Sequence, residues 1–140
     1  DEKLRALALA HLVNMYSKAH VGSLSALCAC GVASGLGASV AVVSMLGGGE
    51  AQMLSAARNM IGSICGMICD GAKEGCAGKV ALAAGLAVEA AYLAMEGCGI
   101  PACDGILHAA WPAMFARLGR LAREGMRETN EVIVALMREE

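Results

Sequence analysis

The sequence predicts an all-α fold, a single compact domain of about five to seven tightly packed helices around a central uncharged helix. No stretch of the 140 residues alternates apolar and polar residues cleanly with period two, as half-buried strands do. Between Lys18 and Glu50 there is no Asp, Glu, Lys or Arg, which is typical of a helix buried on all sides. A chain of this length can bury one core, so we expect residues 1–140 to form one domain.

Apolar residues recur at helical spacing along most of the chain. Leu9, Leu12, Val13 and Tyr16 show this spacing in the first segment, which predicts an amphipathic helix there. The first four expected helices cover residues 2–18, the uncharged segment up to the glycines at 47–49, Ala51 to Ile68, and Gly78 to Met95. A short helix capped by Asp104 is expected to run through Trp111, and the next helix has Pro112 in its first turn. The last expected helix covers Asn130 to Arg138. A short turn is expected from His20 to Leu24, and the last helix is expected to bury Ile133, Leu136 and Met137.

Composition excludes some classes of protein. The chain is 57% hydrophobic with 18 Gly but only one Trp, one Phe and two Tyr, so small and flexible side chains must fill the core. A net charge of -2 gives no electrostatic case for binding nucleic acid. The uncharged run is long enough to span a bilayer, but it is rich in Ala, Gly and Ser rather than Leu, Ile and Phe. We therefore expect no membrane insertion and a cytoplasmic location.

Three of the seven cysteines stand in settings that suit a metal centre. Cys69 and Cys76 bracket a segment with Gly71 and Gly75, which can take positive φ and turn backbone N–H groups inward. Cys28 lies at the start of the uncharged helix, where unpaired N–H groups stabilise a thiolate. Together these thiolates could hold a cubane cluster and leave one iron without a protein ligand, although the spacing matches no ferredoxin ligand run.

Four stretches, residues 27–33, 59–62, 66–77 and 118–126, carry a resemblance to a known family. They resemble the C-terminal region of iron–sulfur L-serine dehydratase alpha chains, L-cysteine desulfidases and their bacterial relatives. The resemblance implies a [4Fe-4S] cluster held by Cys28, Cys69 and Cys76, with the fourth iron facing a small amino-acid substrate. It also implies β-elimination of L-serine or L-cysteine to pyruvate and ammonia, with sulfide as a further product from cysteine.

Family members are much longer than this chain, and the resemblance implies that the proton acceptor lies in their N-terminal portion. We therefore expect a C-terminal fragment or subunit of a larger lyase, which works with that N-terminal portion or with a partner subunit. No residue of this chain is assigned as the catalytic base, because His11, His20 and His108 are scattered along the sequence. The sequence leaves homo-oligomer formation open, as it does the choice between serine and cysteine.

Asn59, Asp70 and Lys73 flank the expected cluster and are candidate substrate-binding residues. Each could bind the substrate carboxylate or neutralise cluster charge, and each could equally cap a helix or lie in solvent. Cys30 is the rival to Cys28 as a ligand. The remaining cysteines are expected to lie outside the site, with Cys65 in the core and Cys98 and Cys103 in structural or incidental positions.

Two other functions remain open at this point. One is a structural zinc domain using Cys28, Cys30, Cys69 and Cys76, although the chain lacks the C-x2-C knuckle usual for zinc in this region. The other is a metal-free helical assembly module without catalysis of its own.

Overall fold

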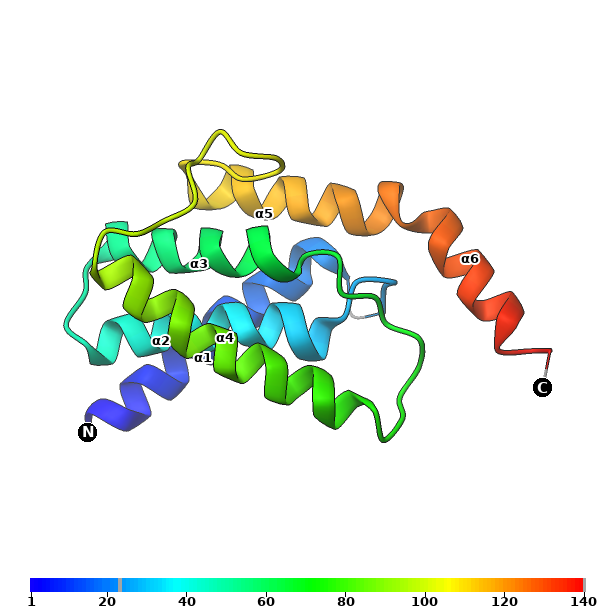
Figure 1. Ribbon diagram of the computed structural model, residues 1–140, viewed down its shortest axis with the longest axis horizontal. Coiled ribbons are helices and arrows are strands. Elements are labelled where there is room, and N and C mark those ends of the chain that lie inside the picture. Colours follow the sequence, from blue (N-terminus) through cyan, green and yellow to red (C-terminus); the bar gives the residue numbers. More distant parts are fainter. Residues whose placement is uncertain (23, 140) are drawn as a thin grey trace.

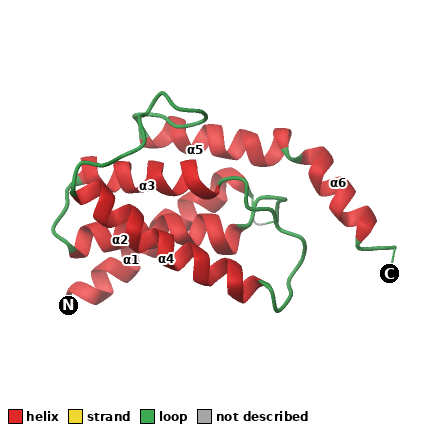
Figure 2. Ribbon diagram, viewed as in Figure 1, coloured by secondary structure: helices red, strands yellow, loops and turns green. Residues whose placement is uncertain are grey.

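The computed structural model describes residues 1–22 and 24–139, and this part of the chain is helical apart from turns, loops and one isolated β-bridge (Figures 1 and 2). Its α-helices are α1 (Glu2–Val21), α2 (Ser34–Met45), α3 (Glu50–Ile64), α4 (Cys76–Met95), α5 (Trp111–Arg120) and α6 (Arg127–Leu136). Two π-helical turns, η1 (Ala29–Ala33) and η2 (Leu121–Gly125), lead into α2 and continue α5. The all-α prediction is confirmed.

The uncharged helix α2 forms the centre of the bundle, as the sequence predicts. It packs against α1, α3 and α4, and most of its residues are buried. Its glycines permit this close packing: a Cβ at Gly37 would overlap the carbonyl oxygen of Ala10 in α1, and a Cβ at Gly35 would lie 3.4 Å from the Cβ of Ala83 in α4. The small residues of the uncharged segment therefore set the spacing of three helices.

One expected helix ends earlier than predicted, and another does not form. α3 ends at Ile64 rather than Ile68, because the next residues leave the helix and pair with an earlier segment of the chain. No helix runs from Asp104 to Trp111 within the described residues. Gly105 takes a φ of +52°, in the left-handed region, and the segment forms turns closed by the bond from the Leu107 N–H to the Asp104 carbonyl at 3.0 Å.

The end of the chain is less buried than expected. α6 begins at Arg127, extends away from the bundle beyond α5 (Figure 1), and leaves Leu136 and Met137 57% and 56% exposed. Ile133 is half-buried. The burial predicted for Leu136 and Met137 is wrong: both side chains stay more than half exposed, although the end of the Met137 side chain lies beside Gly71. At the expected turn from His20 to Leu24, α1 continues to Val21 and Gly22 takes a φ of +100°, while Ser23 lies outside the described residues.

α4 is the one helix of the described residues that is long and apolar enough to cross a membrane. Its mean hydropathy is 1.4 and 22% of its apolar window is buried, yet it also carries Lys79 and Glu89. This match rests on length and composition alone and is weak evidence for a membrane. The expectation of no membrane insertion stays a prediction. The membrane question arose from the uncharged segment, and its helix α2 is buried between other helices.

Candidate metal centre

The isolated β-bridge joins two cysteine-bearing segments that are distant in sequence. Leu27 and Ile68 pair in antiparallel fashion. The Cys28 N–H donates to the Met67 carbonyl at 2.9 Å, and the Cys69 N–H donates to the Ala26 carbonyl at 2.6 Å. Since these bonds fix the backbone on both sides of the bridge, Cys28 and Cys69 lie on neighbouring segments.

Cys28, Cys69 and Cys76 all line one cavity of about 550 Å³. Cys30 and Lys79 line it too, and residues of α6 form another part of its wall. The other lining residues are Leu24, Ser25, Leu27, Ala29, Gly71, Ala72, Asn130, Ile133, Val134 and Met137. The three cysteines are free thiols, with Cys28 buried and the other two half-buried. The structure therefore brings the predicted ligand set to one place.

Two of these cysteines stand at helix N-termini. Cys28 caps the helical run of η1 and α2 with its carbonyl, which accepts the Val32 N–H at 2.8 Å, and Cys76 is the first residue of α4. Unpaired N–H groups at helix N-termini carry partial positive charge and stabilise thiolates. In the loop between Cys69 and Cys76, Gly71 takes a φ of +92° as expected, whereas Gly75 has an ordinary φ of −59°.

Asp70 binds two lysines within this loop region. Its carboxylate accepts from Lys79 at 2.6 Å and also pairs with Lys73. The hydrogen bond from Lys73, followed by that from Lys79, holds the pKa of Asp70 well below its usual range. Lys79 also donates to the Ile68 carbonyl at 2.9 Å. Asp70 and Lys73 thus lie beside the cavity, but neither is among the residues that line it.

Lys79 is a candidate functional residue that the sequence reasoning missed. It lines the cavity, and its hydrogen bond to Asp70 raises its pKa most. The charges of Asp70 and of the Cys28 and Cys76 thiolates raise that pKa further. The sequence feature that could have indicated Lys79 is its position three residues after Cys76, one helical turn along the same face. It is also the one cationic residue of α4.

Asn59 lies outside the cavity lining and serves the packing of α3. Its amide donates to the carbonyls of Ala90 and Cys98 at 3.3 and 3.2 Å and accepts the Ile100 N–H at 2.9 Å. These bonds use the polar groups of a side chain that is 5% exposed. The expectation that Asn59 binds substrate stays a prediction, and Asn59 does not line the cavity shared by Cys28, Cys69 and Cys76.

The cysteines expected outside the site do not line the cavity. Cys65 is half-buried, and burial raises the pKa of its thiol. Cys98 and Cys103 are exposed, in the segment between α4 and α5. Cys30 is exposed as well but lines the cavity, so it stays the rival to the buried Cys28.

The donor set around the cavity fits an iron–sulfur cluster. Thiolates are typical ligands of such clusters, and the helix N-termini and Lys79 would offset the negative charge of a cluster and its thiolates. Within residues 1–22 and 24–139, no three His, Cys, Asp or Glu side chains lie close enough together to hold a single metal ion. A four-iron cluster does not require its ligands to meet at a single ion, because each thiolate binds its own iron at a separate corner.

The fold and the site together define an all-α domain with a thiol-lined cavity. The family described as the serine dehydratase alpha chain matches residues 1–135, and the chain belongs to this family. The resemblance to serine dehydratase alpha chains is thereby confirmed.

Relatives of the chain include UPF0597 proteins from three bacteria. That of Alkaliphilus metalliredigens is 45% identical over 98% of this chain and 31% of the relative. That of Caldanaerobacter subterraneus is 43% identical over 98% of this chain and 32% of the relative. That of Desulfatibacillum aliphaticivorans is 42% identical over 99% of this chain and 32% of the relative. The chain spans about a third of the length of these relatives. No solved structure gives a significant match.

Proposed function

We propose that this chain supplies the cluster-binding part of a lyase that carries out β-elimination on L-serine or L-cysteine. The observation that carries the proposal is the convergence of Cys28, Cys69 and Cys76 on one cavity. Membership of the serine dehydratase alpha chain family supports the reaction class. In this proposal the cofactor is a [4Fe-4S] cluster with those three cysteines as its ligands.

The chain's own residues would hold the cluster and restrain its surroundings. The bridge between Leu27 and Ile68 fixes two of the thiols, and the start of α4 carries the third. Asp70 ties Lys79 to the loop that joins the second thiol to the third. Lys79 supplies a positive charge in the cavity, where it would favour the thiolate form of the ligands and attract a substrate carboxylate.

When bound, the cluster would supply a Lewis acid that polarises the β-hydroxyl or β-thiol of the substrate. Elimination removes the Cα proton and releases the β-substituent as water or hydrogen sulfide, which leaves 2-aminoacrylate. Uptake of water and release of ammonia then give pyruvate. Two-thirds of the relatives' length lies outside this chain, and we place the proton acceptor there. We place the protein in the cytoplasm, because free thiols persist in a reducing compartment.

Anaerobic reconstitution with ferrous iron and sulfide tests this proposal. The expected product is brown, absorbs broadly near ~400 nm and contains iron and acid-labile sulfide in equal amounts, about four of each per chain. Uptake of zinc in place of iron would favour a structural zinc domain. A protein that takes up neither metal would be an assembly module, and the cluster proposal would be wrong.

A further inference from the structure

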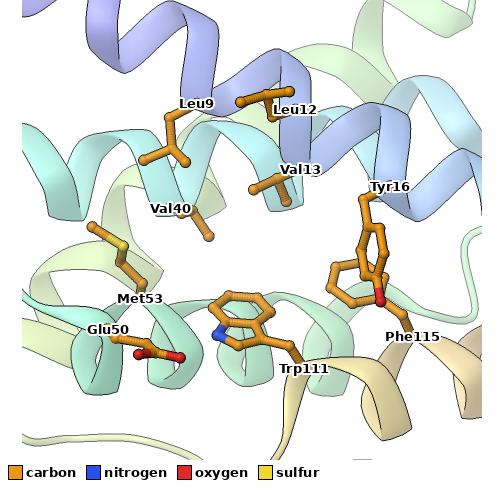
Figure 3. Close-up of a pocket in the computed structure, with 9 residues that line it drawn as sticks. All are labelled: Leu9, Leu12, Val13, Tyr16, Val40, Glu50, Met53, Trp111 and Phe115. Carbon is orange, nitrogen blue, oxygen red and sulfur yellow. The ribbon is translucent and has the colours of Figure 1, made fainter.

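A second cavity, of about 330 Å³, lies between α1, α2, α3 and α5 (Figure 3). It is lined by Leu9, Leu12, Val13, Tyr16, Val40, Glu50, Met53, Trp111 and Phe115. None of these residues lines the cavity of the cysteines. Its volume is at the lower end of the range of ligand pockets, about 300–1,000 Å³.

The chain places three of its four aromatic residues around this cavity. Tyr16 meets Phe115 edge to face with ring centroids 4.9 Å apart, and Trp111 stacks on Phe115 at 6.0 Å. Phe115 is 1% exposed and belongs to the core, but Tyr16 and Trp111 remain partly open to solvent. Aromatic faces that are accessible in this way attract organic cations.

Glu50 contributes the one carboxylate of the cavity, at the first turn of α3. Among the described residues it forms no ion pair. Figure 3 shows its carboxylate on the same side of the cavity as the indole nitrogen of Trp111, while Leu9, Leu12 and Val13 lie across from them. The exposed Glu50 and the half-buried Trp111 thus lie together at one side of an otherwise largely apolar cavity.

We propose that this cavity is a binding site for a small organic ammonium compound with an alkyl body. The alkyl part would lie against the aliphatic residues of α1 and Val40, and the ammonium group would contact Glu50 and the ring of Trp111. A neutral ligand of the same shape gains only the apolar contact, and a carboxylate would meet Glu50 with like charge. The charge at one end of the cavity therefore selects the class of ligand. This site does not depend on the cluster.

Trp111 is the only tryptophan of the chain, so its fluorescence reports on this cavity directly. The purified chain is titrated separately with n-hexylammonium, n-hexanol and hexanoate, which share one chain length. The expected order of affinity is ammonium, then alcohol, then carboxylate, with a preference of about three- to fivefold for ammonium over alcohol, since Glu50 is exposed. No saturable change, or equal affinity for ammonium and hexanoate, would overturn the proposal.

Glu50→Gln removes the charge and keeps the shape, so it should bring the affinity for hexylammonium down to that for hexanol. Glu89→Gln, at an exposed position of α4 and outside the cavity, is the matched control and should leave the preference unchanged. Val13→Phe should fill the cavity and weaken binding of the ammonium and the alcohol together. If Val13→Phe fails to fold by circular dichroism, the Glu50→Gln comparison decides alone. A preference that survives Glu50→Gln would contradict the proposed site.

Discussion

The Cys28 N–H lies 2.9 Å from the Met67 carbonyl and donates to it, which fixes the start of the central helix against the segment that leads to Cys69. Together with the bond from the Cys69 N–H to the Ala26 carbonyl, this contact explains how Cys28 and Cys69, far apart in sequence, come to share one cavity. It also shows why α3 stops at Ile64: the residues that would extend it are needed as the second half of the bridge.

Lys79→Met should weaken the loop around the cavity. The change removes the bonds to Asp70 and to the Ile68 carbonyl, and it takes the positive charge out of the cavity. We expect the reconstituted protein to release iron severalfold faster to a chelator, and Lys79→Arg to restore part of the retention. Lys73→Met is the matched control, because Lys73 also pairs with Asp70 but does not line the cavity. Equal release rates for Lys79→Met and Lys73→Met would contradict a role for Lys79 in the cavity.

Asn59→Ala should destabilise the fold by about 2–3 kcal/mol, because it removes three hydrogen bonds of a buried side chain, including the one that satisfies the Ile100 N–H. Urea unfolding measures this change. Ser63→Ala, at an exposed position of the same helix, should change stability by less than about 0.5 kcal/mol. Iron content per folded chain should match the wild type in both variants; loss of iron from folded Asn59→Ala protein would show that Asn59 acts on the site itself.

Gly37→Ala tests the close approach of α1 and α2. Its Cβ would overlap the carbonyl oxygen of Ala10, and backbone cannot yield as a flexible side chain does. We expect a loss of about 1–3 kcal/mol in the free energy of unfolding. Gly85→Ala, in α4 where nothing lies within 4 Å of the new Cβ, should instead stabilise the protein by up to about 1 kcal/mol. Equal effects of the two substitutions in thermal unfolding would be inconsistent with the helix packing described.

The sequence predicts the fold class because helix patterns are local signals, whereas the grouping of the three cysteines follows from the resemblance to the family. The uncharged run between Lys18 and Glu50 indicates the central helix, and Gly71 marks the loop whose positive φ the structure shows. The resemblance to the family then selects Cys28, Cys69 and Cys76 from seven candidates.

Features that depend on contacts between distant segments could not be predicted in this way. Periodicity continues α3 through Ile68, since only the pairing with Leu27 ends it earlier. Asn59 looks like a functional residue on an apolar helix until its partners in the loop after α4 are known. The apolar pattern in α6 likewise indicates which face is apolar but not which segment covers it. The pattern therefore predicts burial of Leu136 and Met137, which the structure leaves exposed.

The iron content of single cysteine variants after anaerobic reconstitution tests the central claim most directly. Cys28→Ala, Cys69→Ala and Cys76→Ala should each abolish cluster retention, because a cluster held by two thiolates leaves two irons open to solvent. Cys98→Ala and Cys103→Ala, at exposed positions outside the cavity, should retain the wild-type iron content, as should Cys65→Ala. Cys30→Ala decides the ligand near the start of η1: if this variant loses iron and Cys28→Ala retains it, the assignment moves to Cys30. The same iron content in all seven variants would contradict the account, because the cysteines would then be ordinary packing residues.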